Sequence, residues 1–374
     1  MRFGVNSLVW VPVDPVTGRR PTEHQRIWQA IRLAELAEDF GFDAVGFGEH
    51  HYGEFAGSYP FTYLAALAMR TSRVKLLTGV MAMSWHNAVR VAEDLATVDH
   101  ISDGRVGIIT ARGANPRSNE VLGVESGRTS ELQMENYELL RKLLDELHVD
   151  WDGTAGLPLR DVTSIPRPYQ QNIPVWHGTS QNLQIIDRAI EHRDGIFIPF
   201  FFSKGSTVAD VRRQYPSLAK YYREQWYEKW GTLSGSSIGL QTTAFVRQRS
   251  QDAWNEFRPY YDGQRIPGAP KDAWQPPLED LVAAGTILVG SPEEVLDQLG
   301  GMHDAIGQDI QLITFENRGE LFGTQVECME EFASLVMPFA QEKFGTELWS
   351  TPPAIREPYV ASDAELVDGH RRGA

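Results

Sequence analysis

The feature that most constrains this chain is a strand-then-helix unit that recurs along most of its 374 residues. Short apolar runs alternate with longer segments in which apolar residues return at helical spacing. This alternation is typical of a parallel sheet whose strands are joined by crossover helices. Each expected strand is followed by a helix, and the strands are residues 3–9, 44–47, 74–80, 106–111, 174–177, 195–199, 238–246 and 310–315.

Eight strand–helix units predict a (β/α)₈ TIM barrel, an α/β fold. The rival fold, an open doubly wound sheet, normally carries a G-x-G-x-x-G turn after its first strand, and none occurs here. We expect a single barrel domain over residues 1–345 and a C-terminal arm or tail over residues 346–374. Residues 151–168 and 262–277 are rich in Gly and Pro. We expect the first to be an irregular excursion and the second a lid over the barrel mouth, because long loops are often functional.

Charge and cysteine content narrow the class of protein. The net charge of −15 argues against nucleic acid or an anionic membrane surface as the main partner. A single cysteine, Cys328, rules out an intrachain disulfide and fits a reducing compartment. The first residues lead directly into a strand, and no apolar run approaches the roughly 20 residues that span a bilayer. These features predict a cytoplasmic protein.

Three ionisable side chains, Glu49, His50 and His51, lie where the second expected strand ends. The carboxyl ends of barrel strands carry the chemistry in this fold. A general base or a polar contact to a cofactor is one interpretation. A metal site is another, although it needs further ligands. A lone histidine here would more often be a satisfied, partly buried side chain, but the doublet beside a glutamate favours function.

Two further segments suggest an anion site. Arg112 follows the fourth strand and precedes a glycine, so a charged fork lies beside a backbone that a ligand can approach closely. Gly178, Thr179 and Ser180 lie between the fifth strand and its helix, where backbone N–H groups and hydroxyls can bind an anion. Each segment alone is compatible with an ordinary surface arginine or helix cap. Together they predict a phosphate cradle at the barrel mouth.

A weaker signal is Thr78-Gly79-Val80, at the end of the third strand. Gly79 can allow close approach of a ligand to the backbone or an unusual peptide geometry.

In combination these segments resemble the bacterial luciferase-like, flavin-dependent monooxygenase family, including the luciferase alpha subunit. The resemblance covers roughly residues 1–343. The matching motifs are Gly41-Phe42-Asp43 through Glu49-His50-His51-Tyr52-x-Glu54-Phe55, Val89-Arg90-x-x-Glu93-Asp94, Asp103-Gly104-Arg105, Gly290-Ser291-Pro292-Glu293-Glu294, Phe315-Glu316-Asn317-Arg318-Gly319 and Val336-Met337-Pro338.

The resemblance implies a role for each candidate residue. His50 lies where the family has its catalytic histidine, with His51 and Glu49 ordering the site. Arg112 corresponds to an arginine that contacts the flavin phosphate. Gly178, Thr179 and Ser180 match the segment that holds this phosphate. Gly79-Val80 corresponds to a non-proline cis peptide against the flavin ring, which makes Thr78, Gly79 and Val80 cofactor-binding candidates.

The implied chemistry is oxygen activation. Reduced FMN (FMNH2) reacts with O2 to give a flavin C4a-(hydro)peroxide, which oxygenates a small organic substrate. No nicotinamide-binding motif is visible, so we expect a separate flavin reductase. The resemblance also implies a homodimer. Ala111 stands where luciferase has a reactive cysteine, and residues 84–87 replace a loop that contains Pro and Thr, so the substrate pocket differs.

Three alternatives stay open at this point. The same fold serves deazaflavin (F420)-dependent hydride-transfer enzymes. A metal-dependent barrel hydrolase would use His50 and His51 as ligands, whereas we expect no metal. A non-catalytic flavin-binding subunit is the third alternative, and the presence of His50 disfavours it.

Overall fold

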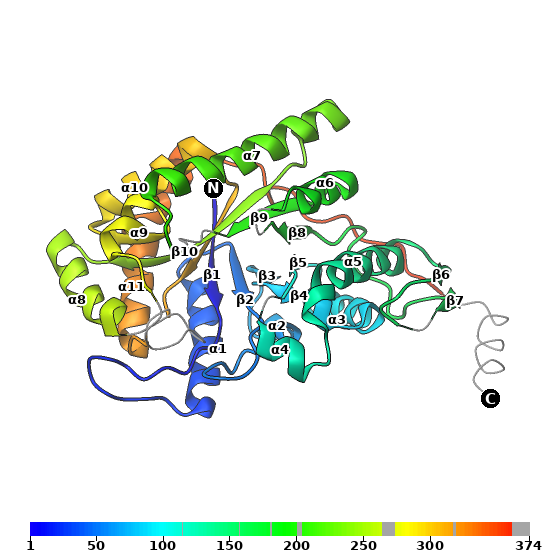
Figure 1. Ribbon diagram of the computed structural model, residues 1–374, viewed down its shortest axis with the longest axis horizontal. Helices are drawn as coiled ribbons and strands as arrows, with labels where there is room; N and C mark the ends of the chain where they lie inside the picture. Colours follow the sequence, from blue (N-terminus) through cyan, green and yellow to red (C-terminus); the bar gives the residue numbers. More distant parts are fainter. Residues whose placement is uncertain are drawn as a thin grey trace.

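The computed structural model describes residues 1–113, 115–156, 158–179, 182–199, 204–263, 274–316 and 319–360. Its centre is a closed barrel of eight strands (Figure 1). In barrel order these are β1 (Arg2–Ser7), β2 (Ala44–Phe47), β3 (Lys75–Thr78), β5 (Val106–Ala111), β8 (Val175–Gly178), β9 (Gly195–Pro199), β10 (Ile238–Val246) and β12 (Ile310–Thr314). Every neighbouring pair is parallel, and β12 pairs with β1 to close the ring. The predicted TIM barrel is confirmed.

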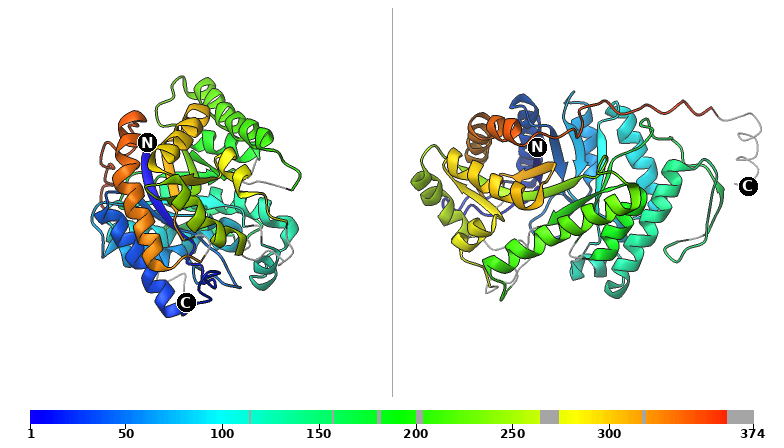
Figure 2. Two further views of the ribbon diagram at one scale, coloured as in Figure 1. Left: turned by 90° about the vertical axis from the view of Figure 1, so that its left-hand side faces the viewer. Right: turned by 90° about the horizontal axis from the view of Figure 1, so that it is seen from above.

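Helices surround this barrel (Figures 1 and 2). Those that follow the barrel strands are α1 (Glu23–Asp39), α2 (Pro60–Ala68), α3 (Ala88–Ile101), α5 (Thr129–Asp145), α6 (Leu183–His192), α7 (Val208–Trp230), α8 (Ser250–Gly263) and α11 (Phe322–Leu335). Local sequence explains their starts. Thr22 and Gln25 form a capping box before α1, and the Asn87 side chain accepts from the backbone N–H groups of Val89 and Arg90 at the start of α3.

Several elements lie outside the simple repeat. Two short strands, β4 (Met81–Ala82) and β11 (Ile287–Gly290), pair with β5 and β10, and β6 (Val149–Trp151) pairs with β7 (Leu159–Val162). The additional helices are α4 (Pro116–Val121), α9 (Leu278–Ala284), α10 (Pro292–Ile306), α12 (Met337–Lys343) and the 3₁₀ turns η1 (Met83–Trp85) and η2 (Ser126–Arg128).

Two sequence expectations need correction. Residues 151–168 are not wholly irregular, because they contain most of the β6–β7 hairpin. The sequence also predicts one helix over about 324–343, but the structure has two helices, α11 and α12, that meet at Val336. Pro338 is the second residue of α12, a position that proline favours because it needs no backbone N–H there. Residues 264–273 of the expected lid lie outside the described residues.

The end of the barrel at which the strands begin is filled with apolar side chains. They form one buried cluster of Ala44, Leu77, Ile109, Trp176, Phe197, Ile310 and Leu312. The segment after α12 covers this end, with the Trp349 ring edge-on to Trp176 at 6.2 Å between centroids and the Leu348 carbonyl accepting from Arg2 Nε at 2.7 Å. Because this end is filled, a ligand site is more readily built at the other end, where the strands finish.

None of the helices in the described part of the chain is long and apolar enough to cross a membrane. The division into a barrel and an arm that begins at residue 346 stays a prediction, and residues 361–374 lie outside the described residues.

Candidate active site

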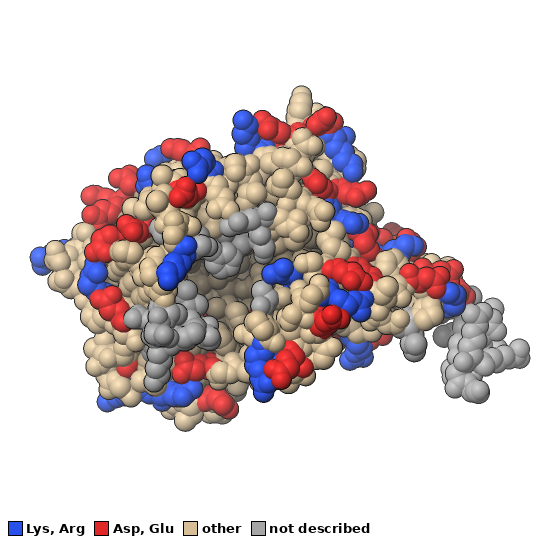
Figure 3. Space-filling view, viewed as in Figure 1, with Lys and Arg blue, Asp and Glu red and all other residues tan. Residues whose placement is uncertain are grey.

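The predicted site residues that the structure describes follow four consecutive barrel strands. Glu49 follows β2, Val80 follows β3, Arg112 follows β5 and Thr179 follows β8. The Glu49 backbone N–H donates to the Val80 carbonyl at 3.0 Å, and pairing of Thr110 with His177 sets β5 beside β8. The strands therefore bring the candidates together at one end of the barrel. The face in Figure 3 is hollowed near its middle, and uncharged residues make up most of what is visible there.

Glu49 is the centre of a hydrogen-bonded cluster. Its side chain is 0% exposed, and its Oε1 lies 2.8 Å from Nε2 of His51 and 2.8 Å from Nε2 of His86. Its Oε2 accepts from the backbone N–H of Ala82 at 2.9 Å. Burial alone would raise the pKa of Glu49, but the hydrogen bonds from both histidines and Ala82 together hold this pKa below its usual value. The buried carboxylate is therefore ionised, and both of its oxygens accept hydrogen bonds.

His50 has a different environment from its neighbour. Its ring stacks on Phe55 with centroids 4.4 Å apart, and its backbone N–H donates to the Gly57 carbonyl. Burial lowers the pKa of His50 to about 4, with His51 also lowering it and Glu49 opposing the shift. The imidazole is therefore neutral at pH 7, the state in which it can accept a proton.

His86 is a site residue that the sequence did not indicate. It follows the η1 turn, away from any strand end, and 37 residues separate it from Glu49. Residues 84–87 stood out only as a departure from the family loop. No sequence pattern indicates that His86 pairs with the Glu49 carboxylate. The contact is visible only once the chain is folded.

The end of β3 is arranged around Asn6 and glycine. The bond between Gly79 and Val80 is cis, as the resemblance implies. Asn6 Nδ2 donates to the Gly79 carbonyl at 3.1 Å, and a Cβ on Gly79 would collide with Asn6 Oδ1. The Thr78 hydroxyl accepts from the Ile109 backbone N–H at 2.8 Å and donates to its carbonyl at 2.9 Å. The Thr78 side chain therefore links β3 to β5.

The proposed phosphate cradle contains an unsatisfied polar atom. Thr179 is 0% exposed, and its Oγ1 has no hydrogen-bond partner among the described residues. A Cβ on Gly178 would lie 3.2 Å from the Thr110 carbonyl, closer than most Cβ contacts. Arg112 is exposed, and within the described ranges its guanidinium makes one long contact of 3.5 Å, to Ser130 Oγ. Ser180 lies outside the described residues.

These observations fit an anionic group. A buried hydroxyl without a partner costs free energy unless a ligand or water binds it. An exposed arginine without a carboxylate partner among the described residues can bind a phosphate through two N–H groups. The chain therefore presents donors suited to an anionic group at the same barrel end as a neutral imidazole and a buried carboxylate.

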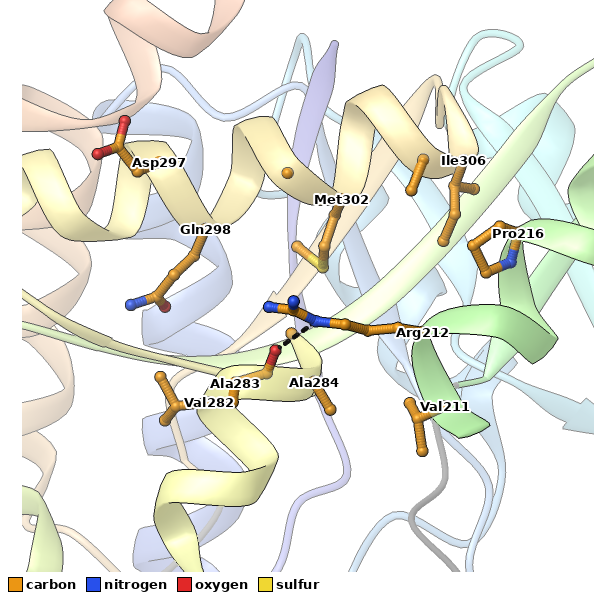
Figure 4. Close-up of a pocket in the computed structure, with 13 residues that line it drawn as sticks. Val211, Arg212, Pro216, Val282, Ala283, Ala284, Asp297, Gln298, Met302 and Ile306 are labelled. Carbon is orange, nitrogen blue, oxygen red and sulfur yellow. Dashed lines mark hydrogen bonds between the residues drawn. The ribbon is translucent and has the colours of Figure 1, made fainter. Parts of the chain in front are cut away.

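Two observations concern other kinds of site. A cavity of about 540 Å³ lies between α7, α9 and α10, where Arg212 Nε donates to the Ala283 carbonyl at 2.8 Å (Figure 4). Its lining comes from the outer helices and includes none of the strand-end candidates. No group of three or more His, Cys, Asp or Glu side chains in the described ranges is arranged to hold a metal ion.

Comparison with known proteins gives consistent results. The family model described as luciferase-like monooxygenase matches residues 1–309. The chain is 33% identical to the oxygenase component of a flavin-dependent trigonelline monooxygenase from Acinetobacter baylyi, over 92% of this chain and 97% of the relative. It is 30% identical to 4-hydroxyprotoasukamycin monooxygenase from Streptomyces nodosus subsp. asukaensis, over 75% and 78%. The crystal structure of the monooxygenase RslO1 from Streptomyces bottropensis has the same fold, with a TM-score of 0.78, 24% identity and coverage of 91% and 99%.

Proposed function

Because the chain belongs to the luciferase-like monooxygenase family, we propose that it uses reduced FMN to activate O2 and to oxygenate a small organic substrate. The observation that carries the proposal is the buried Thr179 hydroxyl after β8, which has no partner among the described residues and lies beside the strand that leads into Arg112. An anion-binding pair at the same barrel end as Glu49 and His50 suits a flavin with a phosphate tail. When bound, reduced FMN supplies the electrons that activate O2.

The residues of the chain divide the remaining work. With FMN bound, its phosphate would be held by Arg112, Gly178, Thr179 and Ser180, and the remaining cofactor contacts would come from Thr78, Gly79 and Val80. His50 is neutral and accepts a proton at an imidazole nitrogen. Glu49 orients His51 through the hydrogen bond at 2.8 Å. Burial of the Glu49 side chain keeps water from its hydrogen bond to His51, which strengthens this interaction.

Two partners belong to the proposal. A separate reductase supplies the reduced flavin, as the designation "oxygenase component" of the trigonelline relative suggests. Two copies of the chain form a homodimer. The substrate is left at the level of a small organic molecule.

The cofactor is tested by anaerobic titration of the protein with reduced FMN and, in parallel, with reduced F420. We expect saturable binding of reduced FMN, and incorporation of ¹⁸O from ¹⁸O2 into product when a panel of small organic substrates is supplied. Tight binding of reduced F420 with hydride transfer that needs no O2 would contradict the proposal and favour the deazaflavin alternative.

The phosphate cradle is tested by Arg112→Gln and Thr179→Val. Each change should weaken binding of reduced FMN by about tenfold. Arg112→Gln removes a charge-assisted hydrogen bond to the phosphate, and Thr179→Val removes the hydrogen bond from the buried hydroxyl. Binding of reduced riboflavin, which has no phosphate, should not change. Arg117→Gln is a matched control, since this exposed arginine pairs with Glu120 at 2.7 Å. Equal weakening of both flavins would remove the phosphate assignment.

A further inference from the structure

We propose that His86 is a positioning residue of this site: through the Glu49 carboxylate it fixes the orientation of His51. The inference deepens the proposed function and rests on it for its catalytic meaning. The contact itself is a property of the chain and can be measured without any flavin.

The geometry around Glu49 determines which nitrogen of each ring carries a proton. An ionised carboxylate only accepts hydrogen bonds. Both Nε2 atoms lie 2.8 Å from the same oxygen, so both must donate to it. The Nδ1 atoms take no part in these contacts, and no hydrogen bond to either Nδ1 is found within the described ranges. Glu49 therefore fixes Nε2 of His51 as a donor to the carboxylate and leaves Nδ1 for other contacts.

His86 completes the donor set of Glu49. With Ala82 on Oε2, the carboxylate has three donors, and two of them share Oε1. The Glu49 side chain is 0% exposed, so bulk water cannot readily replace a donor that is removed. Loss of the His86 N–H would leave Oε1 with His51 alone and allow the carboxylate to rotate. His51 would move with it, because its Nε2 donates to this carboxylate.

The turn that carries His86 is itself firmly anchored. Asn136 Nδ2, from α5, donates to the carbonyls of Met83 at 2.9 Å and His86 at 3.0 Å. The Ser84 hydroxyl donates to the Arg112 carbonyl. The Trp85 ring stands edge-on to His51 with centroids 5.2 Å apart.

One short turn thus contacts both ends of the proposed site. It reaches the histidine cluster through Trp85 and His86, and the phosphate-binding arginine through Ser84. An anchored turn is the kind of support that holds a functional side chain within a narrow range of orientations.

A purely structural role for His86 is the competing interpretation. The centroid of the His86 ring lies 5.4 Å from that of the Tyr59 ring, so His86 also fills space in this cluster. If packing were its whole contribution, His86→Phe would preserve function. If the N–H donor matters, His86→Gln would preserve it, since the amide nitrogen of Gln can reach the same carboxylate oxygen.

The test compares His86→Gln, His86→Asn and His86→Phe, with His100→Gln as control. Asn keeps the amide but is too short to reach Glu49, so it separates reach from chemistry if the Phe variant does not fold. His100 is an exposed residue of α3 whose ring contacts the Arg167 carbonyl, outside the site. The first readout uses protein labelled with ¹⁵N-histidine. The Nε2–H form of His51, identified by its loss in His51→Gln, should persist in His86→Gln and be lost or shifted in His86→Asn and His86→Phe.

The second readout is the rate at which O2 reoxidises reduced FMN bound to each variant, together with the yield of hydrogen peroxide. We expect a change of about tenfold in His86→Asn and His86→Phe, and a rate within about twofold of the unsubstituted protein in His86→Gln. An unchanged His51 signal in folded His86→Asn would overturn the positioning role, whatever the flavin result. Failure of reduced FMN to bind the unsubstituted protein would instead refute the proposed function and leave the histidine measurement intact.

Discussion

A buried ion pair links the first and last strands of the barrel, next to the proposed site. Arg26 of α1 and Glu316, which follows β12, pair with side chains 3% and 1% exposed. Glu316 Oε1 also accepts from the Ser7 hydroxyl at 2.7 Å and from the backbone N–H of Val9 at 3.1 Å. Arg26 Nε donates to the Trp10 carbonyl at 2.8 Å. The pair therefore joins the first and last barrel strands and holds the loop after β1.

Substitution of one partner should destabilise the protein strongly. Glu316→Gln leaves the Arg26 charge buried without a counter-charge, a change that typically costs about 3–5 kcal/mol. Arg26→Met should cost the same or less, because the carboxylate keeps hydrogen bonds from Ser7, Leu8 and Val9. The double variant should be more stable than the sum of the two single losses implies, because neither charge is then left unpaired.

Urea denaturation of the four proteins measures these losses. Glu93→Gln is the control, since its pair with Arg90 is solvent-exposed and should contribute no more than about 0.5 kcal/mol. Losses below about 1 kcal/mol for both single variants, or strictly additive losses, would refute the assignment of a coupled buried pair.

Three other predictions follow from burial. Cys328 is buried, and burial raises the pKa of its thiol to about 12, so a thiol reagent at pH 8 should label it only after unfolding; fast labelling of the native protein would contradict this. Burial lowers the pKa of His50 to about 4, so the unfolded state binds more protons between pH 6.5 and about 4. As the pH is lowered from 6.5 to about 4, the free energy of unfolding should fall by up to about 1.4 kcal/mol per pH unit relative to that of His50→Gln. Denaturation at each pH measures this change. Trp349→Ala should lower the free energy of unfolding by about 2 kcal/mol through lost packing on Trp176, whereas Trp28→Ala, at a site 50% exposed, should cost less than half as much.

The barrel strands could be predicted because each is a short, mostly buried run, rich in apolar residues, between turn residues. Residues 44–47, 106–111, 195–199 and 238–246 begin and end where the sequence indicates. β4 has only two residues and could not be recognised in this way. β11 was not predicted although it is a buried apolar run of four residues; it lies between two helices and is an addition to the eight-strand repeat. Their pairing with β5 and β10 depends on tertiary register rather than on local periodicity.

The same distinction applies to the site. Glu49, His50 and His51 are adjacent in sequence at a strand end, so a positional rule for barrels was enough to find them. His86 follows none of the predicted barrel strands, and its partner Glu49 is 37 residues away. Glu316 does follow a barrel strand, β12, but its partner Arg26 is 290 residues away, so no pattern in the sequence indicates the pairing. Both residues matter because they belong to interactions of a buried carboxylate: His86 donates to Glu49, and Glu316 pairs with Arg26. A buried charge that loses a partner is costly. A polar residue that looks ordinary in sequence can therefore be as necessary as the histidine that the sequence singles out, because its removal leaves the same charge uncompensated.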